Sequence, residues 1–288
     1  MPQTGLARAE GASHSCRVAI YGSITSLEDP LLAPYRTLRQ QVDHRSRRIF
    51  VAEGDKVVRR LLESGLEVDS VVLPPQQVES FAPLLATRRP ELPVYCVEKP
   101  LLEGLTGFQY YQGVLAVGRV PSPPPLEDLL RAMTRAPLLL AIDGLSNPEN
   151  VGTIVRTAGA LGVAGILAGP TTTSPYLRRA VRSSMGAVFG IPILEVETLE
   201  GSLASLAAHG IDCIAAHPHG AAHRLPELDL TRGCCLVLGS EGEGISPPVL
   251  AACHRTASIA MANGVDSLNV GAAAAAFLYE AARQRGRV

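Results

Sequence analysis

Residues 234–248 read CCLVLGSEGEGISPP, an apolar run of five residues followed directly by a glycine-rich turn. Such a run is typical of a buried strand, and glycines that follow a strand allow the backbone to approach a ligand closely. The turn lacks the Lys and the Ser/Thr of a phosphate-binding P-loop, and the carboxylates of Glu241 and Glu243 would repel a phosphate. The stretch therefore predicts a site for an uncharged or cationic ligand.

Similar apolar runs recur between residues 138 and 261 and alternate with helical patterns. Near-continuous apolar strands separated by helices are typical of a parallel sheet covered on both faces, so the sequence predicts an α/β fold. Ligand-binding groups gather at the carboxyl ends of such strands. Polar clusters follow predicted strands at 143–150, 239–244 and 263–269. The predicted strands are 138–145, 164–169, 190–196, 211–217, 234–240 and 256–261, and the predicted helices begin at 150, 176 and 267.

A proline-rich segment divides the chain into two parts. Residues 121–136, PSPPPLEDLLRAMTRA, predict a semi-rigid linker that contains a short helix. Residues 34–120 alternate short strands with helices and predict a smaller α/β domain. The larger parallel-sheet domain is predicted at 137–288. Residues 1–33 are irregular apart from the strand-like run CRVAIYG and are predicted to form an N-terminal extension.

Composition limits the class of protein. Of the 288 residues, 47% are hydrophobic and 18% charged, as expected of a well-packed globular protein. The formal net charge of -1 neither supports nor excludes a nucleic-acid partner, which would have to meet a local basic patch. The six cysteines form no CxxC pair, which predicts buried, reduced thiols in a cytoplasmic protein. No apolar stretch is long enough to span a membrane, and a signal-peptide core is absent.

Two motifs with other meanings are weak. GALGVAG at 159–165 has glycine spacing near that of a dinucleotide-binding fingerprint, but it precedes a strand where the fingerprint should follow one. His217, His219 and His223 offer metal ligands, yet no cysteine or carboxylate stands at a supporting interval. We therefore expect neither an NAD-dependent dehydrogenase nor a metal site.

Three stretches together resemble the motifs of the SpoU/TrmH-type RNA ribose methyltransferases, a family of the SPOUT superfamily. They are NPENVGTIVRTAGALG (147–162), LVLGSEGEGIS (236–246) and IAMANGVDSLNVGAAAAAFLYE (259–280), in the family's order and spacing. RSSMGAVFGIPI (182–193) also resembles family sequence. The resemblance implies a trefoil knot in the C-terminal domain, an exception to the rule against threaded chains. Residues from about 40 to 120 resemble the family's N-terminal substrate-binding domain, which is similar to small RNA-binding ribosomal proteins.

The resemblance also implies the cofactor S-adenosylmethionine and its binding residues. A glycine in the motif lets the backbone approach the adenosine, and a carboxylate tolerates the cationic methylsulfonium group. The implied cofactor-contacting residues are Leu238, Gly239, Ser240, Ile259, Met261 and Leu268.

Five residues match motif positions that the family uses in catalysis: Arg156, Asn150, Glu241, Ser267 and Asn269. The reaction implied is methyl transfer to a ribose 2′-hydroxyl, which needs a lost proton or a stabilised oxyanion. Arg156 is either a base with a strongly lowered pKa or a group that holds phosphate and stabilises the alkoxide; because guanidinium stays protonated in proteins, we favour the second role. Asn150 is alternatively the N-cap of its helix, and Ser267 alternatively a cap of the last helix.

RNA contacts are expected from local basic groups, of which we select Arg182, Arg178, Arg47 and Arg48. The resemblance implies a homodimer whose knotted domains pack together. The additional N-terminal domain favours ribosomal RNA over transfer RNA as the substrate. The alternative function is a non-catalytic RNA-binding or ribosome-assembly factor that keeps the methyltransferase fold. No metal and no membrane partner is expected.

Overall fold

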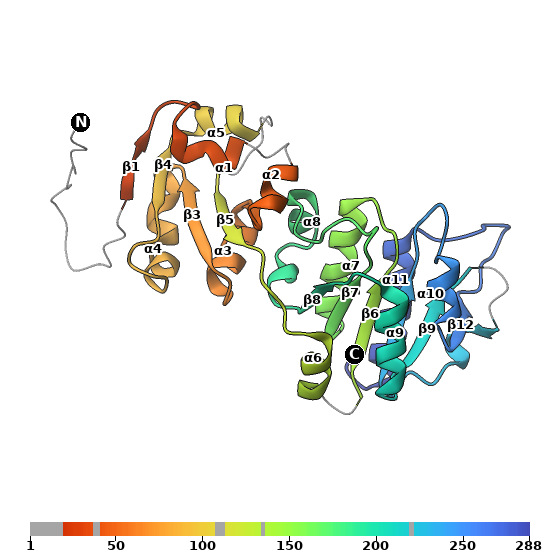
Figure 1. Ribbon diagram of the computed structural model, residues 1–288. Coiled ribbons are helices and arrows are strands. Elements are labelled where there is room, and N and C mark those ends of the chain that lie inside the picture. The colour runs from red at the N-terminus through yellow and green to blue at the C-terminus, as the bar shows by residue number, and fades with distance from the viewer. Residues whose placement is uncertain (1–19, 37–40, 107–112, 134–135, 219–221) are drawn as a thin grey trace.

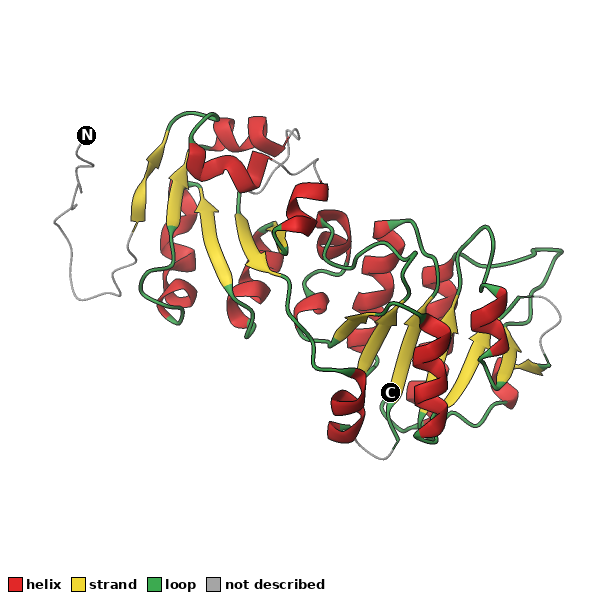
Figure 2. Cartoon of the chain, viewed as in Figure 1, coloured by secondary structure: helices red, strands yellow, loops and turns green. Residues whose placement is uncertain are grey.

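Two β-sheets, one in each half of the chain, organise the protein (Figure 1; Figure 2). The structure is a computed structural model that describes residues 20–36, 41–106, 113–133, 136–218 and 222–288. Within those residues, no helix is long and apolar enough to cross a lipid bilayer.

The N-terminal sheet has five strands in the order β1-β4-β3-β5-β2 and is mixed, because β5 is antiparallel to both β2 and β3. β1 pairs in parallel with β4, and Leu32, in the short 3-10 helix that follows β1, is fully buried. Residues 20–33 are therefore integral to this domain, although the sequence assigned them to an extension; residues 1–19 lie outside the described part. The strands are β1 (Ile20–Ile24), β2 (Ile49–Glu53), β3 (Val68–Leu73), β4 (Val94–Val97) and β5 (Leu115–Arg119).

Helices and turns connect these strands, and α3 is strongly amphipathic. Its apolar side chains Val57, Val58, Leu61 and Leu62 recur at helical spacing and are all buried. The elements are η1 (Pro30–Leu32), α1 (Ala33–Arg36), α2 (Gln41–Ser46), α3 (Asp55–Glu63), η3 (Pro75–Gln77), α4 (Val78–Ala86) and α5 (Lys99–Thr106). The predicted linker contains the predicted short helix, α6 (Leu126–Ala132).

The C-terminal sheet has seven strands in the order β10-β12-β9-β11-β6-β7-β8, and every strand pair in it is parallel. All six strands predicted between residues 138 and 261 are confirmed. Five of them are largely buried because their apolar runs face helices on both sides of the sheet, whereas β12 is only partly buried. The strands are β6 (Leu138–Ile142), β7 (Gly165–Ala168), β8 (Ile193–Glu195), β9 (Asp212–Ala216), β10 (His223–Arg224), β11 (Cys234–Leu238) and β12 (Arg255–Ser258).

The predicted helix at 176–189 is interrupted. It forms α8 and a separate short 3-10 segment, because Met185 and Gly186 adopt positive φ values of 52° and 83° between them. The helical elements of this half are α7 (Pro148–Ala160), α8 (Arg178–Ser183), η4 (Ala187–Phe189), α9 (Leu199–Ala208), η5 (Leu225–Glu227), α10 (Pro247–Ala251) and α11 (Val270–Gln284).

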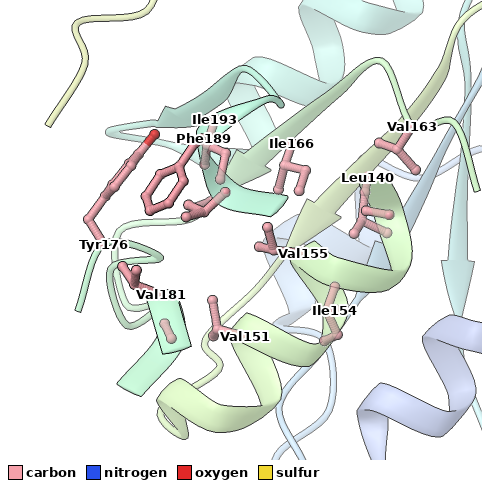
Figure 3. Packing of buried hydrophobic residues seen from close by; sticks show 14 of the residues in the cluster. Leu140, Val151, Ile154, Val155, Val163, Ile166, Tyr176, Val181, Phe189 and Ile193 are labelled. Carbon is pink, nitrogen blue, oxygen red and sulfur yellow. The ribbon is translucent and has the colours of Figure 1, made fainter. Parts of the chain in front are cut away.

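A single hydrophobic cluster extends through both halves of the chain. In the C-terminal half it packs α7 and η4 against β6, β7 and β8, through residues such as Val155, Phe189 and Ile166 (Figure 3). The same cluster includes Phe50 and Val58 of the N-terminal domain. A shared apolar core holds two domains in one relative orientation more firmly than a linker does.

The C-terminal end of α11 is fastened by Arg285. Its guanidinium donates to the carbonyl oxygens of Leu230 and Ala136, both at 2.7 Å, and also to that of Arg232. These acceptors come from segments far from α11 in sequence, so the arginine ties the last helix to the base of the sheet.

We expect Arg285→Ala to destabilise the fold by about 3 kcal/mol, since each charge-assisted hydrogen bond contributes roughly 1.5–3 kcal/mol and these are only partly buried. Tm should fall by several degrees in a thermal scan. Arg283→Ala is the control, because in the described part of the chain the Arg283 side chain pairs only with Glu280 at the surface, and such pairs contribute little. Equal Tm values for the two variants would refute this role for Arg285.

Candidate functional site

Three predicted polar clusters lie at one edge of the C-terminal sheet. β6 ends at Ile142, β11 at Leu238 and β12 at Ser258. Because the sheet is parallel, the loops after these strands meet at its carboxyl edge. The loop after β6 leads into α7, the loop after β11 is the glycine-rich turn, and the loop after β12 leads into α11.

Three of the predicted catalytic residues meet there and form what we term the amide–carboxylate cluster: Asn150, Glu241 and Asn269. Glu241 Oε1 accepts a hydrogen bond from Asn150 Nδ2 at 2.7 Å and another from Asn269 Nδ2 at 2.6 Å. Asn269 Nδ2 also lies 3.4 Å from Asn150 Oδ1. One residue from each motif contributes, so the cluster joins the three loops at a single carboxylate oxygen.

Helix capping fixes the position of Asn269 and the start of the helix that carries Asn150. Asn269 caps α11, because its Oδ1 accepts from the backbone N–H of Gly271 at 2.9 Å while its Nδ2 faces Glu241. Asn147, and not Asn150, caps α7 through a hydrogen bond from the backbone N–H of Glu149. The alternative in which Asn150 is the cap is therefore wrong, and its amide is free to serve the cluster. Ser267 does not cap α11 either.

The glycine-rich turn closes on itself. Ser240 and Gly244 exchange two backbone hydrogen bonds, at 2.9 and 3.1 Å, and Glu243 N–H donates to Ser240 Oγ. A Cβ added to Gly239 would lie 2.2 Å from the carbonyl carbon of Gly244. The chain's own backbone therefore requires glycine at position 239, in addition to any ligand.

Asp143 anchors the far side of this turn. It is buried directly after β6, and its Oδ2 accepts from the backbone N–H of Ser246 at 2.7 Å. Its own N–H donates to the carbonyl oxygen of Leu238. The sequence places Asp143 in the polar cluster 143–150 but predicts no role for it. A carboxylate directly after a buried strand is the feature that could have indicated a structural role.

The predicted cofactor residues differ in accessibility. Leu238 is fully buried in β11, so only its backbone is available to a ligand. Ile259 and Met261 are half-buried, and Leu268 is 41% exposed. Within the described residues, the backbones of Ala260 and Met261 form no hydrogen bond, so their N–H and C=O groups are free at this edge. The surface thus combines apolar side chains with unpaired backbone groups.

Arg156 lies outside the amide–carboxylate cluster. It is exposed on α7 and, in the part of the chain that the structure describes, forms no hydrogen bond or ion pair. It follows Asn150 by six residues, which places it about 9 Å further along the helix axis and on another side of the helix. Ser267 is exposed near the cluster. The structure therefore brings Asn150, Glu241 and Asn269 together and leaves Arg156 and Ser267 open to solvent.

The four selected arginines have different surroundings. Arg182 is 61% exposed, whereas Arg178 is only 15% exposed and donates from Nε to Glu53 Oε2 at 2.6 Å. Its burial in this pair argues against a direct RNA contact by Arg178. Arg48 bonds to Pro121 O and Ser122 Oγ of the linker, and Arg47 is exposed beside it.

The remaining histidines and cysteines that the structure describes form neither a metal site nor a reactive thiol. No three His, Cys, Asp or Glu side chains of the described residues lie close enough to hold a metal ion, and His219 lies outside those residues. Burial raises the pKa of the Cys213 and Cys253 thiols to about 12, helped for Cys253 by the nearby charge of Asp143. These thiols remain protonated at neutral pH, as the sequence predicts for buried cysteines.

The proteins to which this chain is similar are named as RNA methyltransferases. Residues 137–279 match the model of the SpoU rRNA methylase family. A tRNA/rRNA methyltransferase of Mycobacterium tuberculosis, named as uncharacterised, is 32% identical over 270 residues, which cover 89% of this chain and 90% of the relative. The 23S rRNA (guanosine-2′-O-)-methyltransferase of Acinetobacter baylyi is 32% identical over 188 residues, or 64% of this chain and 75% of that protein.

The structural comparison extends over both domains. An AdoMet-bound rRNA methyltransferase from Sinorhizobium meliloti has a TM-score of 0.79 at 30% sequence identity, and the match covers 91% of this chain and 97% of that one. The predicted family resemblance and the predicted knotted α/β fold are thereby confirmed.

Proposed function

The chain belongs to the SpoU rRNA methylase family, and on this premise we propose that it methylates a ribose 2′-hydroxyl of ribosomal RNA with S-adenosylmethionine as the methyl donor. The observation that carries the proposal is the amide–carboxylate cluster of Asn150, Glu241 and Asn269, which joins the three family motifs at the carboxyl edge of the sheet. Ribosomal RNA is favoured over transfer RNA because the match with an rRNA methyltransferase includes the N-terminal domain.

The residues at the edge of the sheet fit this cofactor. The exposed side chain of Leu268 and the half-buried Ile259 offer apolar surface to an adenine ring, and the free backbone groups of Ala260 and Met261 can read its polar edge. Glu241 supplies a negative charge, which attracts the cationic methylsulfonium group of the cofactor and would repel a phosphate. Gly239, Ser240 and Leu238 would contribute through backbone at the turn.

When bound, S-adenosylmethionine supplies an electrophilic methyl group on a positively charged sulfur. The ribose O2′ must lose its proton, which solvent water accepts at this exposed edge, as the new O–CH₃ bond forms and the S–CH₃ bond breaks. We assign Arg156 to this step as a permanently charged donor that holds a flanking phosphate and stabilises the negative charge developing on O2′. Its exposure and its lack of partners in the described chain leave the guanidinium available.

The cluster itself has a positioning role. Glu241 accepts from both amides, so Asn150 Oδ1 keeps a lone pair, and the carboxylate still has Oε2, for ribose hydroxyls. Ser267 adds a hydroxyl beside it. These groups orient the ribose so that O2′ faces the methyl group.

A non-catalytic assembly factor is the alternative function. Such a factor needs the RNA-binding surface but not an intact cluster, and here all five candidate catalytic residues are present. One experiment distinguishes the two functions. An assembly factor would keep its biological effect in an Arg156→Ala variant, whereas an enzyme would lose it.

We also propose that the active form is a homodimer located in the cytoplasm. α11 exposes Ala272 and Tyr279, the loop before it exposes Leu268, and the neighbouring face of α7 exposes Thr153 and Arg156. Tyr279 is 55% exposed, an unusual position for a large aromatic side chain on a small-residue helix face. A second copy packed on this face would bring Arg156 of one protomer close to the cofactor loops of the other.

Tyr279→Glu is therefore expected to shift the protein from twice the chain mass of 30.4 kDa to that mass in light scattering coupled to size exclusion. A carboxylate buried at the interface would lack a partner, which opposes association. Methyl transfer should fall with the loss of dimer. Arg131 pairs with Asp128 on α6, which packs against the opposite face of the sheet from α7 and α11, so the matched control is Arg131→Gln. A wild-type protein that is monomeric, or a variant that stays dimeric, would disprove the proposal.

A further inference from the structure

One ion pair crosses the boundary between the two domains and is almost completely removed from water. Glu53, the last residue of β2, is 6% exposed, and Arg178, the first residue of α8, is 15% exposed. Arg178 Nε donates to Glu53 Oε2 at 2.6 Å, and Arg182 Nη1 lies 4.0 Å from Glu53 Oε1. In Figure 1 the N-terminal domain meets the C-terminal domain next to α8.

The pair lies in a built interface. Phe50, three residues before Glu53, stacks on Phe189 with ring centroids 5.4 Å apart and packs at 5.7 Å against Tyr176. Burial raises the pKa of Tyr176, so that ring stays neutral. Arg60 Nη1 adds a hydrogen bond to Met185 O at 2.5 Å. We term this contact between β2, α3 and the segment 176–189 the domain seam.

The energetics of the ion pair favour a role in orientation over one in stability. Removing both charges from water costs several kcal/mol per ion, and an apolar pair of similar volume in such a place is often equally or more stable. Arg178 Nη2 is in addition buried without a hydrogen-bond partner among the described residues. What the pair provides is one allowed docking angle, because any other angle leaves a buried charge unpaired.

Exposed cations surround the seam on both domains: Lys56 and Arg60 on α3, and Arg179 and Arg182 on α8. An RNA backbone that lies across the seam meets positive charges from both domains at spacings that the docking angle sets. The methyl-transfer site lies in the C-terminal domain, so the same angle decides where RNA bound by the N-terminal domain presents its ribose.

We propose that Glu53 and Arg178 are positioning residues for RNA: they fix the angle between the domains and so align substrate held by the N-terminal domain with the methyl-transfer site. The inference rests on the proposed function. It predicts that loss of the pair weakens productive RNA binding and leaves cofactor binding intact, because neither residue touches the amide–carboxylate cluster.

The test compares four variants in the full-length protein. Glu53→Leu combined with Arg178→Met replaces the pair by apolar side chains and should fold with an unchanged or higher Tm. Glu53→Gln keeps the shape and removes the charge. Glu53→Arg combined with Arg178→Glu restores opposite charges in reversed order. Asp69→Asn is the matched control, since Asp69 pairs with Arg119 at 2.9 Å within the N-terminal domain and away from the seam.

Each variant is assayed with tritiated S-adenosylmethionine and 23S rRNA transcribed in vitro. We expect the apolar double variant to lose about ten- to a hundredfold in kcat/KM, mainly through KM, because an ångström of misalignment has effects of that size. The affinity for S-adenosylmethionine, measured by calorimetry, should stay unchanged. Small-angle scattering should show a broader distribution of inter-domain distances, the reversed pair should recover part of KM, and Asp69→Asn should match the wild type.

Two results would overturn the inference. One is a wild-type KM in the apolar double variant, which would mean that the stacked aromatic rings set the angle alone. The other is a loss confined to kcat together with weaker cofactor binding, which would indicate damage to the site itself. If the wild-type protein transfers no methyl group to any RNA, the proposed function fails; filter binding of the same 23S rRNA to the four variants then still decides the role of the pair.

Discussion

Arg156→Ala is expected to lower methyl transfer to RNA by about 10²–10³-fold, the effect of removing one donor that stabilises a developing oxyanion. The affinity for S-adenosylmethionine should not change, because the exposed side chain of Arg156 forms no hydrogen bond to the cofactor loops of its own protomer and its proposed partners are RNA atoms. Arg156→Lys should recover only part of the rate, since an ammonium group lacks the planar fork that binds phosphate and oxyanion together. Single-turnover kinetics with saturating cofactor measure the effect.

Arg131→Ala is the matched control for this prediction. Arg131 is an exposed arginine on α6 whose side chain, among the residues that the structure describes, pairs only with Asp128 three residues earlier; α6 precedes β6 and so lies at the opposite edge of the sheet from the candidate site. The prediction fails if Arg131→Ala and Arg156→Ala have the same rate, or if Arg156→Ala loses cofactor affinity in parallel with activity. A rate for Arg156→Lys that rises steeply with pH, in contrast to the wild type, would instead support the role of a base.

Gly239→Ala is expected to raise the Kd for S-adenosylmethionine by at least about tenfold, equivalent to 1.4 kcal/mol or more. An added Cβ would stand 2.2 Å from Gly244 C and 2.3 Å from Ile245 N, both of them backbone atoms that a rotamer change cannot move. The turn must therefore open, which breaks the paired hydrogen bonds between Ser240 and Gly244 and displaces Glu241 from the two amides.

The same turn contains the control. A Cβ at Gly242 would meet no atom within 4 Å, so Gly242→Ala should bind the cofactor like the wild type. Calorimetric titration of both variants measures the difference. Equal affinities would show that the turn can shift without cost, and that the close approach at Gly239 is unimportant for binding.

Much of this architecture could be predicted from the sequence because the relevant signals are local. Each strand of the C-terminal sheet is a short apolar run, and the order of strands and helices implies that their carboxyl ends share one edge. That reasoning was sufficient to bring Asn150, Glu241 and Asn269 to one place, although they are up to 119 residues apart. The sequence also indicates the N-cap of α7. Proline favours the first position of a helix, so Pro148 marks the helix start and Asn147 before it is the expected cap.

The features that sequence reasoning missed depend on distant partners. β1 pairs with β4 some 70 residues later, and nothing in the run IYGSI itself distinguishes a strand of the domain from an isolated one in an extension. Arg178 stands in a run of basic residues that reads equally well as an RNA contact; its pairing with Glu53, 125 residues earlier, follows only from how the domains dock. The break at Met185 and Gly186 likewise reflects the close packing of Gly186 against Arg60 across the seam.

The most direct test of the central claim is transfer of tritiated methyl groups from S-adenosylmethionine to unmodified 23S rRNA, followed by digestion and separation of nucleosides. The proposed chemistry predicts label in a 2′-O-methylated nucleoside and a loss of that label in Arg156→Ala. Label on a base, or no label in any RNA despite measurable cofactor binding, would contradict it.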